Sequence, residues 1–311
     1  MSISVVVPTQ NEEQTISQLI KSLLDQTLQP EEIIIVDGYS EDSTVQKVQD
    51  ISKTNKKVKI FFRKKKCRGS GRNTGIKNAK GKFIALIDAG CTIENDWLEK
   101  FYLEKNFDII FGVVKPYSKT LQDISYKSIL ISKTNYKELI TPSVCSMLVK
   151  KSVFEKINFK ESNDGSYLVE DLDFIDKILA SNLKFKYSID AIVSWKISSK
   201  WNKILSRHKE YSLGALKTKY FKIWYKGLFR NYIFFIIICF FSFFYSYYLL
   251  LLIFILALIK SYSYLNFLKN FRKISIYTKI KLIIINIFQF LLIDLASLIS
   301  FVKFYFFKRL T

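Results

Sequence analysis

Carboxylates follow two apolar runs in this 311-residue chain, and two more open a later amphipathic segment. Asp37 ends the run EEIIIVD, Asp88 ends KFIALID, and Glu170 and Asp171 stand at the start of EDLDFIDKIL. Carboxylates bind cations, accept hydrogen bonds from hydroxyl and N–H groups, and act as general bases where a neighbouring like charge raises their pKa. These side chains are therefore candidates for such chemistry, and the plainer alternative for Asp88 is a strand cap.

The elements that must position these acids alternate along the first 115 residues. ISVVVP, EEIIIVDG, VKIFFRK and KFIALIDAG are predicted strands, with amphipathic helices after the first two and a Gly-rich segment before the fourth. This order predicts an α/β fold with a mostly parallel sheet, whose ligands bind at the carboxyl ends of the strands. Further strands are expected in FDIIFGVVKP, CSMLVK and KFKYSIDAIVSW, and a helix in YLVEDLDFIDKILASN.

The C-terminal third has a different composition from the rest. Beyond Glu210 there are 14 Lys and Arg but one acid, Asp294, so this part carries +13 of the net charge of +21. Residues 231–259 contain no charge, and 282–302 form a second apolar run that includes Asp294. About 20 apolar residues cross a bilayer. We therefore predict two domains, 1–215 and 216–311, the second a membrane region with two or three segments.

Basic residues on both sides of 231–259 suit a tight hairpin that returns to the cytoplasmic face, and one long tilted helix is the alternative. We expect a multi-pass protein of the cell membrane whose N-terminal domain is cytoplasmic. The net charge is not accompanied by a nucleic-acid-binding motif, so no nucleic-acid partner is expected. Four cysteines lie far apart and the chain has one histidine, which argues against a zinc site and a disulfide framework.

Four segments in order, VVVPTQNEE, IIIVDGYSEDST, GRNTGIKNAKGKFIALIDAG and VEDLDF, resemble those of a family 2 glycosyltransferase with the GT-A fold. The resemblance covers about the first 215 residues. It implies an inverting, membrane-anchored enzyme that uses a nucleotide diphosphate sugar, with the nucleotide bound by the strand ends and the Gly-rich segment. The residues that would bind this donor are Pro8, Thr9, Gln10, Glu12, Asp37, Arg72 and Asp88.

Two of these segments have a plainer alternative. PTQNEE is also an ordinary strand-to-helix turn with Asn11 as its cap. The segment GSGRNTG is also a generic flexible loop, although its glycines allow close approach of the backbone and Arg72 offers a charged fork for phosphate oxygens. Because no Gly-Lys-Ser/Thr follows, it is not a P-loop.

Asp88 matches the metal position of the family, where a second acid usually stands two residues later. This chain has Gly90 there. Mg²⁺ is often held by one or two carboxylates with substrate phosphates and water, so Mg²⁺ or Mn²⁺ remains the expected cofactor, bound less tightly.

The resemblance makes Asp171 the general base, with Glu170 as the acid before it. Two adjacent acids raise each other's pKa, although the pair is also compatible with a solvated helix terminus. RHKEYSLGA resembles a segment that follows the base in relatives, and so proposes Arg207, His208 and Tyr211 for the acceptor or diphosphate. An amphipathic membrane-entry helix explains the same three residues.

We therefore expect a hexosyltransferase-type enzyme of cell-envelope glycan synthesis, acting on a lipid-linked saccharide or polysaccharide. A polyprenyl-phosphate sugar synthase is the nearest alternative, since its phosphate acceptor needs no strong base. A catalytically silent GT-A membrane scaffold is the alternative from another class.

Overall fold

The computed structural model describes residues 2–63, 67–117, 119–132, 142–162, 169–196, 198–218, 220–245, 248–266, 268 and 271–306. The chain divides into two compact units. The first contains Met1–Tyr117 and Glu138–Ile197, and the second contains Ser118–Lys137 and Ser198–Thr311. This division differs from the predicted boundary at 215, because the segments 118–137 and 198–215 belong with the C-terminal part.

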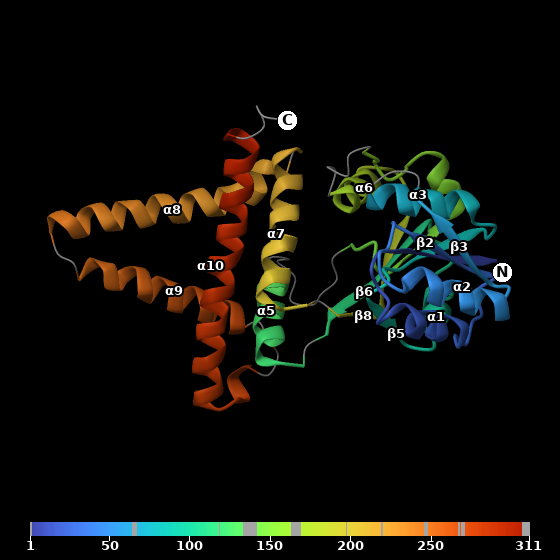
Figure 1. Cartoon of the computed structure of the whole chain (residues 1–311), viewed down its shortest axis with the longest axis horizontal. Coiled ribbons are helices and arrows are strands. Elements are labelled where there is room, and N and C mark those ends of the chain that lie inside the picture. The colour runs from blue at the N-terminus through green and yellow to red at the C-terminus, as the bar shows by residue number, and fades with distance from the viewer. Residues whose placement is uncertain are drawn as a thin grey trace. The chain divides into compact units, whose positions relative to one another are not determined.

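The first unit is built on an eight-stranded mixed sheet (Figure 1). Its strands, in spatial order, are β3 (Val58–Phe62), β2 (Glu32–Asp37), β1 (Ile3–Thr9), β4 (Phe83–Leu86), β7 (Met147–Lys150), β6 (Ile109–Pro116), β8 (Phe185–Trp195) and β5 (Cys91–Ile93). The pairings from β3 to β4 are parallel, and so is β6 with β8, whereas β7 and β5 run antiparallel to their neighbours. The predicted α/β sheet and its strands are confirmed.

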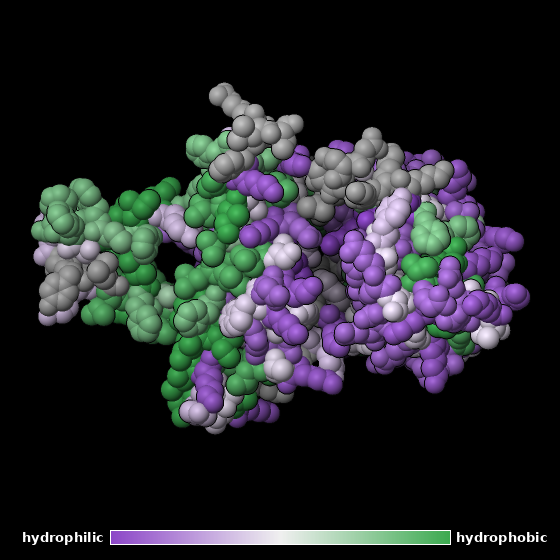
Figure 2. All heavy atoms as spheres, viewed as in Figure 1, coloured by the Kyte–Doolittle hydropathy of each residue, from purple (hydrophilic) through white to green (hydrophobic). Residues whose placement is uncertain are grey.

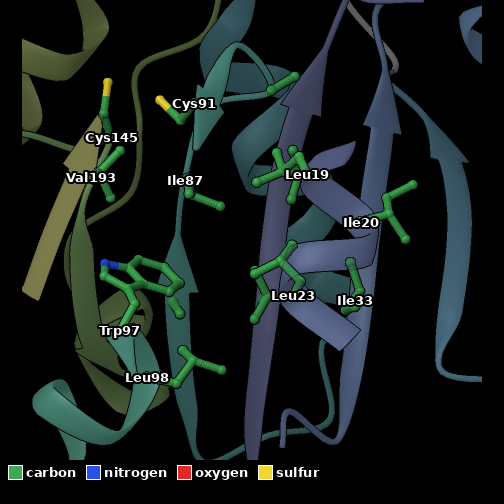
Figure 3. Close-up of a cluster of buried hydrophobic side chains, with 14 of the residues drawn as sticks. Leu19, Ile20, Leu23, Ile33, Ile87, Cys91, Trp97, Leu98, Cys145 and Val193 are labelled. Carbon is green, nitrogen blue, oxygen red and sulfur yellow. The ribbon is translucent and has the colours of Figure 1, made fainter. Parts of the chain in front are cut away.

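Helices cover both faces of this sheet. One face carries α1 (Ile16–Leu24), α2 (Thr44–Thr54) and α4 (Trp97–Tyr102), and the other carries α3 (Arg68–Asn78) and α6 (Glu170–Leu179). Figure 3 shows Leu19 and Leu23 of α1 beside Ile87, with Cys91 and Cys145 at the upper end of the same hydrophobic cluster. A short 3-10 helix, Lys151–Glu155, follows β7.

The Gly-rich segment forms the helix α3 and is not a loop. The packing of this helix on the sheet accounts for its glycines. A Cβ at Gly75 would stand 2.3 Å from Val6 Cγ1, so only glycine lets α3 approach β1 this closely. Similarly, a Cβ added at Gly69 would stand 2.3 Å from the Lys160 carbonyl oxygen. The glycines that disfavour a helix in isolation are thus required where this helix packs on the sheet.

The second unit is helical. It contains α5 (Leu121–Ser132), α7 (Trp201–Leu216), α8 (Phe221–Phe244), α9 (Leu249–Asn266), a 3-10 turn (Phe271–Lys273) and α10 (Ile276–Phe306). Figure 1 shows α5 and α7 lying alongside α10, while α8 and α9 project from them as a hairpin. Tyr225–Phe244 and Ile276–Phe306 are long and apolar enough to span a membrane.

Candidate active site

The β1 and β2 ends are tied together by their turns. Asn11 and Tyr39, which follow the two strands, both have positive φ, 55° and 66°. The Asn11 backbone N–H donates to Ser40 Oγ at 2.8 Å, and the Ser40 N–H donates to Asp37 Oδ1 at 2.9 Å. The Asn11 side chain accepts from the Glu41 N–H at 2.9 Å. The predicted nucleotide-binding edge is therefore a rigid double turn.

The side chains predicted to bind the nucleotide border this double turn. Asp37 is buried at the end of β2, and Thr9 lies beside it in the β1–β2 register. The Thr9 hydroxyl is buried without a hydrogen-bond partner in the described part of the chain. Gln10 is exposed and accepts from Arg63 Nη2 at 3.4 Å, and Pro8 faces α3 next to Gly71.

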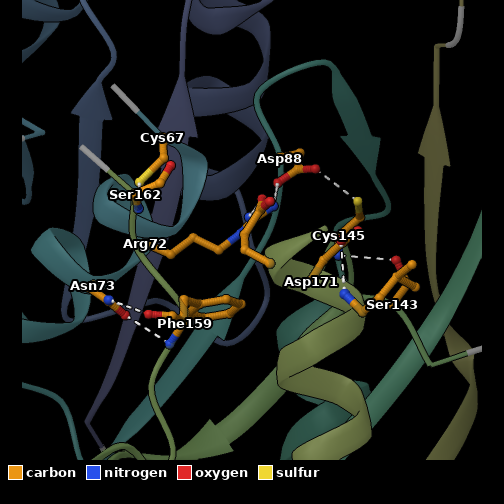
Figure 4. Close-up of polar contacts among 11 residues, drawn as sticks. Cys67, Arg72, Asn73, Asp88, Ser143, Cys145, Phe159, Ser162 and Asp171 are labelled. Carbon is orange, nitrogen blue, oxygen red and sulfur yellow. Dashed lines mark hydrogen bonds and ion pairs between the residues drawn. The ribbon is translucent and has the colours of Figure 1, made fainter. Parts of the chain in front are cut away.

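Arg72 is the centre of the site. Its guanidinium donates from Nη1 to Glu170 Oε1 at 2.8 Å and from Nη2 to Asp88 Oδ1 at 3.1 Å. It also lies 5.3 Å from the centre of the Phe159 ring. Arg72 and Glu170 are almost completely buried, whereas Asp88 is 30% exposed. The acids predicted at the strand end and at the helix start are thus joined through one buried cation (Figure 4).

The second oxygen of Asp88 has a partner that the sequence did not indicate. Cys145 Sγ donates to Asp88 Oδ2 at 2.9 Å. Burial, and then the charge of Asp88, raises the pKa of the Cys145 thiol well above its usual value. Cys145 therefore stays protonated and acts here as a hydrogen-bond donor.

Asp171 differs from Glu170 in its surroundings, although they are adjacent. Burial, and secondarily the charge of Glu170, raises the pKa of Asp171 to about 6, against the opposing charge of Arg72. Asp171 Oδ1 accepts the backbone N–H of Leu172 at 2.9 Å. A carboxylate with a raised pKa at the edge of such a site can take a proton near neutral pH. Glu170, bound to Arg72, holds that cation in place.

The carboxylates offer an incomplete set of metal ligands. Within the described residues, no group of three or more His, Cys, Asp or Glu could hold a metal ion. A Cβ at Gly90 would stand 3.5 Å from Glu12 Oε1, so Glu12 lies in the space where a second acid would project. Burial, and then the charges of Asp42 and Asp88, raises the pKa of Glu12. Glu12 and Asp88 interact electrostatically, and a cation held by these two carboxylates would need further ligands from outside the protein.

Comparisons with known proteins give the family of this chain. The sequence model of glycosyl transferase family 2 matches residues 4–157, which contain both strand ends, α3 and Asp88. The chain belongs to this family. The match ends before α6, so the roles predicted for Glu170 and Asp171 in this family 2 glycosyltransferase lie outside the matched residues and stay predictions.

The family 2 glycosyltransferase has relatives in archaea and bacteria. An uncharacterised glycosyltransferase of Methanocaldococcus jannaschii is 29% identical over 70% of this chain and 78% of its own. The poly(ribitol-phosphate) beta-glucosyltransferase of Bacillus spizizenii is 36% identical over 37% of this chain, but over only 19% of its own length. The crystal structure of S. aureus TarS superposes with a TM-score of 0.49 at 22% identity, covering 68% of this chain and 39% of that one.

The remaining predicted residues of the family 2 glycosyltransferase lie in its second unit. Arg207, His208 and Tyr211 are on α7. The Tyr126 hydroxyl hydrogen bonds with His208 Nε2 at 3.0 Å and accepts from Arg207 Nη1 at 3.2 Å. These contacts fasten α7 to α5, and the acceptor or diphosphate role of the three residues stays a prediction.

Proposed function

We propose that this enzyme transfers a sugar from a nucleotide diphosphate sugar to a hydroxyl acceptor by an inverting single displacement, with Asp171 as the general base. The observation that carries the proposal is the raised pKa of Asp171 beside the Arg72-centred pair of acids. The acceptor oxygen attacks the anomeric carbon while the bond to the diphosphate breaks. The hydroxyl proton passes to Asp171 and the nucleoside diphosphate leaves.

In this proposal the two strand ends hold the nucleotide. Asp37 and Gln10 are offered to the base and ribose, and Thr9 supplies a buried hydroxyl with unused hydrogen-bonding capacity. Arg72 is a positioning residue, because it holds Asp88 and Glu170 and is itself buried. A divalent cation, Mg²⁺ or Mn²⁺, would be held by Asp88 and Glu12 together with the diphosphate, where it would supply positive charge to the leaving group.

We further propose that the acceptor is a lipid-linked saccharide or polysaccharide at the cytoplasmic face of the cell membrane. The apolar helices of the second unit support membrane association, and the Bacillus spizizenii relative supports a polymeric acceptor. A polyprenyl-phosphate acceptor is less favoured, because an attacking phosphate is already ionised and leaves the raised pKa of Asp171 without a use.

The test is transfer and hydrolysis of a panel of nucleotide sugars with Mg²⁺ or Mn²⁺, using wild type, Asp171→Asn and Asp88→Ala. Asp173→Asn is the matched control, since Asp173 lies on the same helix but pairs with Lys177 at 2.8 Å. The rate of Asp171→Asn is expected to be lower than that of wild type by about 10²- to 10⁴-fold, the usual contribution of a general base. Full activity of Asp171→Asn would refute the base assignment. If wild type binds no nucleotide sugar, the scaffold alternative is supported instead.

A further inference from the structure

The helix α10 is amphipathic in an unusual sense, because its buried face contains the polar groups. Its buried residues recur every three or four positions and so form one side of the helix. They are Leu282, Asn286, Gln289, Phe290, Ile293, Ala296, Ser297 and Ser300. The opposite side is exposed and apolar over most of its length. It presents Ile280, Ile284, Phe288, Leu291, Leu295, Leu298, Ile299 and Val302.

Hydrogen bonds fix the buried face against two other helices of the same unit. Asn286 Nδ2 donates to Ser128 Oγ at 3.0 Å, and Ser125 Oγ donates to Gln289 Oε1 at 2.7 Å, so α5 lies along the first part of this face. Farther along, Ser300 Oγ donates to the Lys209 carbonyl oxygen of α7 at 3.0 Å. From Asn286 to Ser300 the helix rises about 21 Å, and over this length it is accompanied by α5 and α7.

The helix α7 is unsuited to hydrocarbon. Its exposed residues include two charged side chains about two turns apart, Lys203 and Glu210, together with Asn202 and Ser206. If α10 stood upright across a bilayer core of about 30 Å, α7 would have to stand in the core with it. Charged side chains at that depth are costly and are found facing a bundle interior or a water-filled cavity, not an exposed surface.

We infer that α10 does not cross the bilayer but lies along its surface, with its apolar side in the outer part of one leaflet. The helix is then an interfacial anchor, and α5 and α7 stay on its aqueous side. Of the two apolar runs in the sequence, this leaves 231–259, in α8 and α9, as the part that enters the hydrocarbon. Figure 2 shows hydrophobic residues over α8, α9 and the adjoining side of α10, and hydrophilic residues over α7 and α5.

The partner that fits this surface is an anionic lipid leaflet. An interfacial helix buries its apolar side about 5–10 Å deep and is helped by cations near the lipid phosphates. Exposed cations stand near both ends of the apolar side: Arg272, Lys273 and Lys281 near its start, and Lys303 after it. The described part of α10 has one acid, Asp294, which is only partly exposed. The apolar residues of α8 and α9 continue the same surface into the membrane.

Depth measurements in vesicles distinguish the two orientations. Ile284→Cys, Leu291→Cys and Leu298→Cys, each in full-length Cys239→Ser protein, place a spin label on the exposed side at intervals of about 10 Å along the axis. The label depth is measured from the relative accessibility to oxygen and to a water-soluble nickel complex, in vesicles of phosphatidylglycerol and phosphatidylethanolamine. Phe240→Cys on α8 is the control, and its label is expected to be the deepest.

A helix lying on the surface gives three similar, shallow depths. An upright helix places one of the three labels about 10 Å deeper below the nearer membrane surface than another, and that result would overturn the proposal. A second measurement needs no substitution within the chain. An epitope added after Thr311 should be digested by protease from the same side of the vesicle as the first unit; its protection would also overturn the proposal. Neither experiment depends on sugar transfer.

Discussion

The pH dependence of transfer is the sharpest test of the proposed base. Burial and the charge of Glu170 raise the pKa of Asp171 to about 6. A base must be ionised to accept a proton, so the rate should follow the deprotonated fraction of Asp171. That fraction is about 0.9 at pH 7 and about 0.1 at pH 5, whereas a carboxyl with the ordinary pKa near 4 would still be about 0.9 ionised at pH 5. The expected fall in rate from pH 7 to pH 5 is therefore roughly tenfold.

The same raised pKa predicts that stability and activity change in opposite directions: as the pH rises, the rate increases while the free energy of unfolding decreases. Between about pH 4 and pH 6 the folded state holds a proton on Asp171 that the unfolded state has released, so the free energy of unfolding decreases as the pH rises. Asp171→Asn avoids this penalty. At pH 7.5 the variant should be more stable than wild type by about 1–3 kcal/mol, and the difference should vanish below about pH 4.

The assay is the initial rate of transfer at saturating donor from pH 4.5 to 8.5, with thermal unfolding measured in the same buffers. Asp173→Asn, whose residue is paired with Lys177, serves as control and should change neither profile. A rate that stays flat between pH 5 and pH 7.5 in wild type would refute the reasoning, and so would an Asp171→Asn variant that is inactive but less stable at pH 7.5.

Four other outcomes are expected. Arg72→Ala should lower the free energy of unfolding by about 3–5 kcal/mol in denaturant titrations, because it leaves a buried acid without its cation; an unchanged midpoint would contradict the buried pair. Gly75→Ala should destabilise by about 1–3 kcal/mol through overpacking, while Gly227→Ala, whose added Cβ meets nothing within 4 Å, should be neutral or stabilising. Binding of Mn²⁺, followed by its paramagnetic resonance signal, should require a nucleoside diphosphate and be lost in Asp88→Ala; tight binding without the nucleotide would disprove the shared site. Asp37→Ala should weaken nucleotide binding about 10- to 100-fold by calorimetry, since hydrogen bonds to charged groups contribute about 1.5–3 kcal/mol, and equal affinity would remove Asp37 from the site.

The parts of this enzyme that follow from local patterns were predictable. Buried strands such as 32–37 and 83–86 are predicted by their apolar runs. The acids that follow these strands lie at one edge of the sheet, because parallel strands end at the same edge. The position of the helix α6 followed from its amphipathic pattern, and this position puts Glu170 and Asp171 in the first turn.

What was missed depends on contacts between distant segments. Cys145 reaches Asp88 across 57 positions, and no spacing rule connects a lone cysteine with an acid. Phe159 lies against Arg72 for the same kind of reason. The helix α3 was not expected because glycine has a poor helix propensity, and the close approach to Val6 that requires Gly75 is visible only in three dimensions.

The pairing of α5 with α10 has a consequence for the order in which the protein is made. Ser125 and Gln289 are hydrogen bonded although they lie 164 residues apart in the sequence. At roughly 5–20 residues per second of synthesis, α5 waits on the order of 10–30 s for its partner. During that time the strands and helices between them can complete the first unit. The sheet that carries the candidate active site is thus synthesised first, and the pairing of α5 with α10 is completed last.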